Sequence, residues 1–468
     1  MASLGVYVLT FNCARNLIQH DSFAAHLFRV LPKTWPQSRE LPEILVLSLQ
    51  EIAPIAYAFL GGSFLDPYFH AFRCSVSIAA GEQRYENVIT KNAGTTAVMV
   101  FVREDVTENI AWVKTAEVGV GVMEIGNKGA AAAQISYRIR EGTVDLTFVA
   151  VHLAPNEWAV DRRNEDWKNI AQKLVFSKVD RGENPQVHDE RNEEDVPLLQ
   201  TQSSDANGEI GLYCPSSYLF VAGDLNYRTS LTRPGPKDYE RFPRPTEDID
   251  SPHHFSHLLA KDQLTKELQE QGVLYTLSEA PITFLPTYKI VVPTHQEASL
   301  GSFGVWTWAK KRWPSWCDRV LYRGIPSSTT SGDGGIEAQG YDALPILQTS
   351  DHRAVALSAS VPLKPTLAPP VFIPPFDIDP NWKIKRLAAK RKEVIVGDPL
   401  DHERNCDGCQ IHEAKMVDLE NVNATPGPEH YGWRPYVLDY LLSPPFGFRY
   451  SPRLAIGEWV YFSDLVLS

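Results

Sequence analysis

The sequence contains few cysteines and no long apolar run. Six cysteines scattered among 468 residues are too few for the disulfide framework of a secreted domain and favour a reducing compartment. No segment approaches the ~18 to 20 apolar residues that a transmembrane helix needs. The first eleven residues lack the basic start and small-residue cleavage site of a signal peptide. We therefore expect a cytoplasmic protein that does not span a membrane.

Positive charge is also scarce. Forty-five Lys and Arg residues against 57 Asp and Glu residues give a net charge of −12, so the chain as a whole repels polyanions such as nucleic acid or acidic lipid. Any such partner needs a locally basic patch. With 43% hydrophobic residues and 11 Trp, the chain can fold around a core. We expect a monomer with no nucleic-acid partner.

The first 362 residues carry the pattern of one α/β domain. Short apolar or alternating runs predict strands at residues 6–11, 44–49, 95–102, 130–137 and 144–152. Helical periodicity predicts a helix at 161–176, with Trp167, Ile170 and Leu174 on one face. Within this domain, residues 180–211 begin with seven acidic residues between positions 180 and 195 and show no apolar period. We interpret them as a disordered acidic insertion.

The remainder of the chain has a different composition. Seven prolines between positions 362 and 380 predict a Pro-rich linker over residues 363–382. Residues 383–468 comprise a basic segment and a tail to which the pattern assigns no structure. A small group of His and Cys side chains at 402–412 lacks the usual spacer between pairs of zinc ligands, so we interpret them as ordinary tail residues.

Polar side chains follow several of the predicted strands at the point where each strand ends. They are Asn12, Glu51, His152, Asp224, Asn226, Asp351 and His352. One such residue alone more often has a structural role than a catalytic one. Together, a set rich in carboxylates and amides, without Cys or His pairs at zinc spacing, suits a hard cation such as Mg²⁺.

The short motifs that contain these residues resemble the inositol polyphosphate 5-phosphatases, in that family's order, and in particular a small, fungal-like member. The motifs are FN at 11–12, QE at 50–51, NKGA at 127–130, HL at 152–153, GDLNYR at 223–228, PTYK at 286–289, PSWCDRVL at 314–321 and SDHR at 350–353. The resemblance implies the endonuclease/exonuclease/phosphatase fold, an α/β four-layer sandwich of two packed mixed β-sheets flanked by helices. It also implies a Mg²⁺-dependent hydrolase that removes the 5-phosphate from phosphatidylinositol 4,5-bisphosphate, related phosphoinositides or soluble inositol polyphosphates.

The resemblance further assigns roles to the strand-end residues. Glu51, assisted by Asn12, would hold Mg²⁺. Asp224, with Asn226 beside it, would orient and deprotonate the attacking water.

The remaining catalytic positions concern the phosphoryl group. His152 and His352 would donate hydrogen bonds to its oxygens. Asp318 would fix the tautomer of His352, and Asp351 would support the metal side of the site. A structural alternative for Asp318 and Arg319 is a buried ion pair that only organises the sheet.

Substrate binding would use residues near the same motifs. The resemblance places Tyr227, Arg228 and Lys289 at the phosphate on the inositol 4-position. The full set of expected substrate contacts is Asn127, Lys128, Tyr227, Arg228, Tyr288, Lys289, Lys311 and Arg319. Lys311 lies in a basic stretch that is equally typical of an exposed turn.

The expected partner is a phosphoinositide lipid headgroup or a soluble inositol phosphate. With a lipid substrate we expect peripheral contact with cytosolic membrane faces, including those of the endoplasmic reticulum. The aromatic segment 59–72 is either a lipid-facing loop or part of the core. Two alternatives stay open at this point: a nuclease of the same fold, and an inactive phosphoinositide-binding module.

Overall fold

The computed structural model describes residues 2–32, 41–120, 128–178, 211–214, 216–246, 248–270, 272–291, 307–325 and 335–364. They belong to a unit formed by residues 1–396. The predicted acidic insertion up to residue 210, most of the Pro-rich linker, the basic segment and the tail lie outside the described residues. So do Asn127 and the His and Cys residues at 402–412, and the predictions made for all of them stay predictions.

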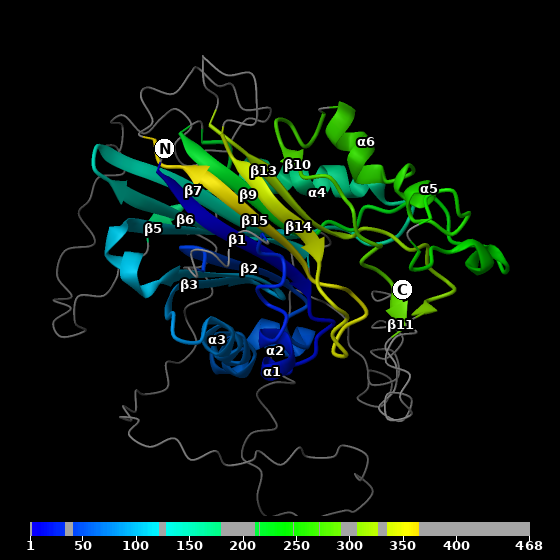
Figure 1. Cartoon of the computed structure of the whole chain (residues 1–468), viewed down its shortest axis with the longest axis horizontal. Helices are drawn as coiled ribbons and strands as arrows, with labels where there is room; N and C mark the ends of the chain where they lie inside the picture. Colours follow the sequence, from blue (N-terminus) through cyan, green and yellow to red (C-terminus); the bar gives the residue numbers. More distant parts are fainter. Residues whose placement is uncertain are drawn as a thin grey trace, which may run out of the picture. The chain divides into compact units, whose positions relative to one another are not determined.

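The first sheet has six strands and is mixed. Strand β1 (Ser3–Asn12) runs parallel to β2 (Ile44–Gln50), and the other neighbours pair antiparallel. The strand order is β14 (Glu337–Ala343), β15 (Val355–Pro362), β1, β2, β4 (Thr96–Arg103) and β3 (Tyr85–Ala93). The two ends of the domain's sequence therefore meet, because β15 pairs with β1 (Figure 1).

The second sheet has seven strands and is also mixed. Here β7 (Gly142–His152) and β9 (Ser217–Asp224) form the parallel pair. The order is β10 (Ser278–Glu279), β13 (Asp318–Arg323), β9, β7, β6 (Lys128–Ile139), β5 (Ile110–Val120) and β8 (Ser177–Lys178). A separate small ribbon joins β11 (Ile290–Val291) to β12 (Thr307–Trp308).

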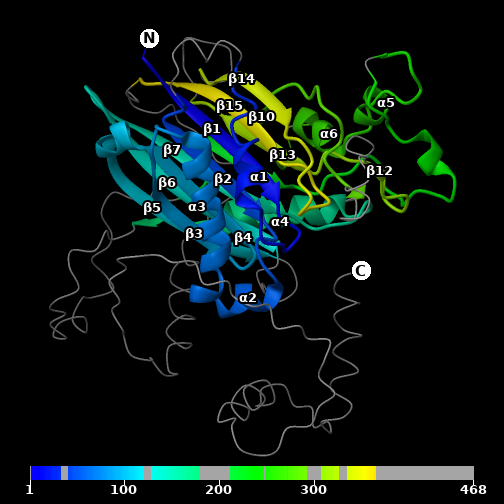
Figure 2. The ribbon, with the colours of Figure 1, turned by 60° about the horizontal axis from the view of Figure 1, so that its bottom comes forward.

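Helices cover the outer face of each sheet. The first sheet carries α1 (His20–Ala24), α2 (Ile55–Leu60) and α3 (Asp66–Ala80), which come forward in Figure 2. The second carries α4 (Val160–Lys173) and α6 (Gln263–Glu270), whereas Leu258 and Leu259 of α5 (Ser256–Leu259) pack against the hydrophobic cluster between the sheets. Short 3-10 turns occupy Gly62–Phe64, Glu104–Asn109 and Asp238–Arg241. Within the described ranges, no helix combines the length and the apolar character needed to cross a membrane.

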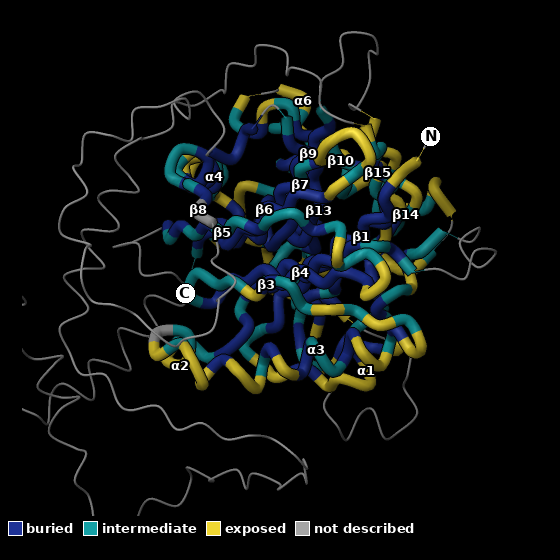
Figure 3. Tube along the Cα trace, turned by 90° about the vertical axis from the view of Figure 1, so that its left-hand side faces the viewer, coloured by how far each residue is buried: buried dark blue, intermediate teal, exposed yellow. Residues whose placement is uncertain are grey.

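The strands are apolar on both faces because each face meets a different hydrophobic layer. On β1, Val6 and Val8 point into the core between the two sheets, whereas Tyr7 and Leu9 pack with α1 and α3. On the other sheet, Val149 and Val151 pack with Trp167 of α4. Figure 3 shows the sheets as a buried centre between more exposed outer helices. The expected helix–sheet–sheet–helix sandwich is confirmed.

The parallel pairs determine where the polar strand ends meet. In the first sheet Asn12 lies opposite Gln50, and in the second His152 lies opposite Asp224. Asp224 is also the register partner of Asp318 on β13. A hydrogen bond of 2.7 Å from Ser48 Oγ to the Ala222 carbonyl joins the two sheets near these ends. The carboxyl ends of β1, β2, β7 and β9 thus form one polar edge.

A glycine allows the close approach of β9 to β7 at this edge. A Cβ atom added to Gly223 would lie 1.9 Å from the carbonyl oxygen of Val151. Gly223→Ala should therefore lower the free energy of unfolding by about 1–3 kcal/mol, the usual cost of overpacking. Urea denaturation measures this. Gly272→Ala, where a Cβ meets nothing within 4 Å, is the control, and equal stability of the two variants would contradict the prediction.

Candidate active site

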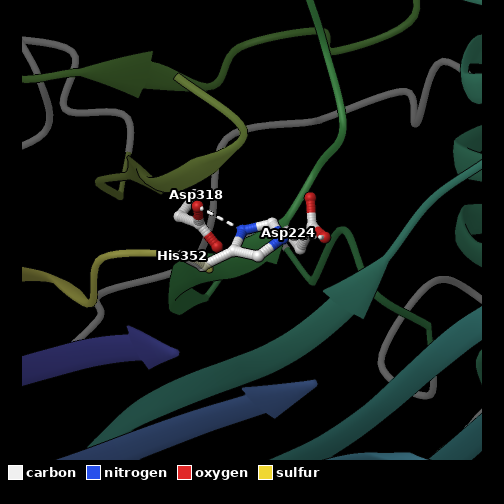
Figure 4. A group of neighbouring side chains, drawn as sticks. All are labelled: Asp224, Asp318 and His352. Atoms are coloured by element: carbon white, nitrogen blue, oxygen red, sulfur yellow. Dashed lines mark hydrogen bonds and ion pairs between the residues drawn. The ribbon is translucent and has the colours of Figure 1, made fainter. Parts of the chain in front are cut away.

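Three buried side chains form the centre of the polar edge (Figure 4). His352, in the loop between β14 and β15, places its Nδ1 2.9 Å from Asp318 Oδ2 and its Nε2 3.9 Å from Asp224 Oδ2. Asp224 ends β9 and Asp318 begins β13. The two carboxylates therefore flank the imidazole on opposite sides.

Loop geometry holds these side chains in place. Ser350 Oγ donates to the Asn12 carbonyl at 2.6 Å and accepts a hydrogen bond from the His352 amide at 3.0 Å. Glu51 and Asn226 both adopt positive φ, 46° and 57°, which is uncommon for side chains other than glycine and often marks a functional site. The Asn226 amide donates to Asp224 Oδ1 at 3.1 Å. The site is thus fixed by contacts between loops from both sheets.

The two carboxylates set the charge of His352. Burial alone would lower the pKa of His352, but the nearby Asp318 and Asp224 carboxylates raise it to about 9. Asp318 Oδ2 also accepts a hydrogen bond of 2.7 Å from Thr287 Oγ1. Burial raises the pKa of Asp318, while the charge of His352 and the two hydrogen bonds to Oδ2 favour its ionised form and oppose that rise. His352 is accordingly an imidazolium at neutral pH.

His152, in contrast, is a neutral imidazole. Its Nε2 lies 2.6 Å from Lys128 Nζ and 3.3 Å from Asp224 Oδ2. Burial, together with the Lys128 ammonium, lowers the pKa of His152. The site therefore contains one charged and one neutral imidazole, although the sequence predicts the same role for both.

Glu51 and Asn12 lie beside this group with oxygen atoms suited to a hard cation. Burial would raise the pKa of Glu51, but the charges of Lys128, Arg15 and His352 lower it overall, so the carboxylate is ionised. The Asn12 Nδ2 donates to Asp224 Oδ2 at 2.9 Å, and its Oδ1 accepts from the Ala14 amide at 2.9 Å, which leaves that oxygen one lone pair. Carboxylate and amide oxygens are the donors that Mg²⁺ prefers, so these residues fit the expected ion.

Asp224, Asp318 and His352 also lie close enough together to hold a metal ion, with their ligand atoms within 4.8 Å of one another. However, Asp318 Oδ2 and His352 Nδ1 already form a hydrogen bond with each other. This arrangement suits an imidazolium better than a metal ligand. Glu51 with Asn12 is the better-fitting candidate.

Arg228, Tyr288 and Lys289 line the same side of the site as His352. The Arg228 guanidinium lies 4.4 Å above the Tyr288 ring, and that ring lies 4.5 Å from the His352 imidazole. Lys289 Nζ contacts Asp351 Oδ2 at 2.5 Å. Asp351 therefore pairs with the expected substrate lysine, and its support of the metal side stays a prediction. Lys311 is exposed.

Two of the expected substrate contacts are buried side chains that already have partners. Tyr227 is fully buried, and its hydroxyl donates to Asn164 Oδ1 of α4 at 2.6 Å. Arg319 is fully buried between Asp262, at 2.8 Å, and Glu279, at 2.5 Å. A side chain whose polar atoms are satisfied in the core has none left for a ligand. Arg319 thus forms buried ion pairs, but with Asp262 and Glu279 and not with Asp318 as the structural alternative had it.

Sequence reasoning also missed several residues of the site. Thr287 and Ser350 lie inside the recognised motifs but carry no obvious catalytic group. Arg15 is less expected: its Nε lies 3.1 Å from Glu51 Oε2, and its backbone amide donates to the Glu51 carbonyl at 2.7 Å. Arg15 adopts a φ of 66°, a turn that no pattern at this non-glycine position predicts.

Comparison with known proteins agrees with this geometry. The sequence profile of endonuclease/exonuclease/phosphatase family 2 matches residues 9–358. The chain belongs to this family. The resemblance to the 5-phosphatases is confirmed by curated relatives. Type II inositol polyphosphate 5-phosphatase 15 of Arabidopsis thaliana is 32% identical over 56% of this chain. Inositol-1,4,5-trisphosphate 5-phosphatase 1 of Schizosaccharomyces pombe is 31% identical, also over 56%.

Both relatives are much longer than this chain. The matched part spans 23% of the Arabidopsis protein and 18% of the yeast protein. Among solved structures, the inositol polyphosphate 5-phosphatase domain of SPsynaptojanin, in complex with inositol (1,4)-bisphosphate and calcium, is 23% identical with a TM-score of 0.54. The alignment covers 84% of this chain and 91% of that domain. It confirms the family fold.

The charge of His352 can be tested by substituting its partner. Asp318→Asn keeps the shape of the side chain and removes the negative charge, so burial should then dominate and lower the pKa of His352 below the wild-type value of about 9. In the wild type, the stabilisation from the imidazolium is complete below the unfolded pKa of about 6.5 and is lost as the pH rises through the folded value. NMR titration of the histidine ring signals in EDTA measures the midpoint.

His352→Gln assigns the His352 signal in these spectra. Asp248→Asn, an exposed carboxylate, is the matched control and should leave the midpoint in place. The same midpoint in wild type and Asp318→Asn would show that Asp318 does not set the charge of His352.

Proposed function

We propose that this protein is a Mg²⁺-dependent phosphomonoesterase that removes the 5-phosphate from inositol phosphates, soluble or carried on a lipid. The observation that carries the proposal is the buried imidazolium of His352 between Asp318 and Asp224, in a chain whose curated relatives are named 5-phosphatases. An imidazolium beside oriented carboxylates suits a reaction in which negative charge gathers on phosphoryl oxygens.

In this proposal Asp224 orients the attacking water. Burial would raise the pKa of Asp224, but the hydrogen bond with His152 and the charge of His352 lower it. Asp224 is thus a permanent carboxylate that accepts a proton weakly and positions water well. Phosphoryl transfer through a loose transition state needs little base strength, so positioning is the larger contribution.

The positive groups of the site hold the phosphoryl group. His352 donates from Nε2 to an equatorial oxygen, where its charge is most effective in a buried site. Mg²⁺ held by Glu51 and Asn12 would add positive charge at a phosphoryl oxygen. Lys128, near both Glu51 and His152, adds a further cation.

A second phosphate on the substrate would bind beside Tyr288. Lys289 is 39% exposed there, and Arg228 presents a buried Nη1 that has no hydrogen-bond partner among the described residues. Arg312 adds charge nearby but is paired with Glu157 at 3.0 Å. These groups support a preference for substrates that carry a 4-phosphate.

A lipid substrate would bring the site to a membrane surface. Within the segment 59–72, Leu65, Phe69 and Phe72 are buried, as expected of core residues. Leu60 and Phe64 are 64% and 47% exposed, as expected of residues that face lipid. Trp158, six residues after His152, is 56% exposed. These exposed apolar side chains lie in the segments that follow Glu51 and His152 in the sequence. They support peripheral contact with a cytosolic membrane face.

The activity is tested by phosphate release from phosphatidylinositol 4,5-bisphosphate and from inositol 1,4,5-trisphosphate, each with and without Mg²⁺. We expect release that depends on Mg²⁺, and a loss of about 10²- to 10⁴-fold in kcat for Asp224→Asn. Glu82→Gln, which changes an exposed carboxylate, should retain full activity. No release from either substrate, together with cleavage of DNA, would replace the proposal with the nuclease alternative.

Membrane contact has its own test. The double variant Leu60→Ser with Phe64→Ser should weaken sedimentation with vesicles containing phosphatidylinositol 4,5-bisphosphate at least about tenfold, because burying such a side chain contributes about 1.5–3 kcal/mol. Its activity on soluble inositol 1,4,5-trisphosphate should not change. Ile78→Ser, on the exposed face of α3 with 51% exposure, is the control. Equal vesicle binding by both variants would contradict the proposed surface.

A further inference from the structure

The side chain of Gln263, the first residue of α6, joins two loops that leave the site. Its Oε1 accepts hydrogen bonds from Arg163 Nη2 at 2.7 Å and from the Arg228 amide at 2.8 Å. Its Nε2 donates to the Ser230 carbonyl at 2.9 Å and to the Glu157 carbonyl at 3.2 Å. All four hydrogen-bonding positions of the amide are therefore occupied.

The orientation of this amide is fixed by its partners. A guanidinium and a backbone amide can only donate, and two backbone carbonyls can only accept. Turning the amide over would place donors against donors and acceptors against acceptors. Neither Glu nor Met can replace it, because Glu has no donor for the two carbonyls and Met has neither group.

The two loops joined by Gln263 carry the catalytic strand ends. Glu157 lies in the loop that follows His152 at the end of β7, and Arg228 and Ser230 lie in the loop that follows Asp224 at the end of β9. The backbone amide of Gln263 also donates to the Arg228 carbonyl at 2.9 Å. Gln263 thus forms hydrogen bonds with both the backbone amide and the backbone carbonyl of Arg228.

The position of Arg228 affects the catalytic imidazole through Tyr288. The Arg228 guanidinium is fixed at one end by Asn226, whose backbone oxygen it contacts at 3.0 Å and whose side-chain oxygen it also contacts. Its other face covers the Tyr288 ring at 4.4 Å, and the Tyr288 ring lies 4.5 Å from the His352 ring. A shift of the Arg228 backbone would therefore disturb the packing of Tyr288 against the His352 ring.

We propose that Gln263 is a positioning residue for hydrolysis: its amide clamps Arg228 against Tyr288, and so holds His352 in place without touching the substrate. The inference rests on the proposed function for its kinetic consequence. Its structural consequence, the placement of the His352 ring, does not depend on which reaction the protein catalyses.

The kinetic test separates positioning from general loss of stability by a double-mutant cycle. Gln263→Met should lower kcat on inositol 1,4,5-trisphosphate by about 10- to 100-fold with little change in KM. Because Gln263 acts through Arg228, the double variant Gln263→Met with Arg228→Met should be no slower than Arg228→Met alone. If the fold-losses in kcat of the two single variants multiply in the double variant, the proposal is overturned. An unchanged kcat in Gln263→Met would overturn it as well.

Gln134→Met is the matched control. Gln134 is a buried glutamine on β6, and its side-chain Nε2 donates to Thr147 Oγ1 on β7 at 3.2 Å. Its substitution should cost stability in urea denaturation, while any kinetic loss should multiply with that of Arg228→Met. Gln263→Glu, of the same size as the native residue, is the second variant if Gln263→Met does not fold.

A spectroscopic measurement tests the proposal even if the wild-type protein releases no phosphate. The ring signals of His352 depend on the nearby Tyr288 ring, so Gln263→Met should shift them and Gln134→Met should not. Unmoved His352 signals in the Gln263 variant would overturn the positioning role. Shifted signals in a protein that hydrolyses no inositol phosphate would uphold it and reject only the proposed function.

Discussion

The buried carboxylate of Asp224 is the constraint on which the site depends. It is 2% exposed and lies within 3.9 Å of polar atoms of Asn12, His152 and His352. A charge buried without partners costs several kcal/mol, so the fold must bring those partners to it. Two of them come from strand ends in different sheets, β1 and β7, and the third from a loop. The two sheets therefore have to meet at this edge in one register.

The sequence predicts the central strands well and the peripheral ones poorly. Residues 44–49 and 144–152 match β2 and β7 within two residues, because strands buried on both faces are continuous apolar runs. By contrast, β3 at the sheet edge is mostly half-exposed and has the polar sequence YENVITKNA, which no apolar pattern marks. The sandwich of two sheets was predicted only from the family motifs, since periodicity does not tell which strands pair.

In the site, the residues at strand ends were predicted well, whereas those predicted only because they lie in a motif were predicted less well. Strand-end polarity predicted Asn12, Glu51, His152, Asp224 and His352, all of which the structure brings together. Arg319 points away from this group because adjacent residues of a strand point to opposite faces. Asp318 faces His352, so Arg319 faces Asp262 and Glu279. Motif membership shows that a residue is near a site, but the pleat of the strand decides which way its side chain points.

The charge arrangement favours a multiply charged substrate over a single anion. The chain carries a net charge of −12, and three cations near the site already lie beside carboxylates: Lys289 pairs with Asp351, Arg312 with Glu157, and Lys128 lies near Glu51. An incoming phosphate must compete with these carboxylates. A dianionic phosphate at each of two positions gains from several cations at once, whereas a weakly charged ligand cannot offset the lost ion pairs. Under the proposed function, selectivity for polyphosphorylated rings would follow from the ion pairs within the site as much as from its shape.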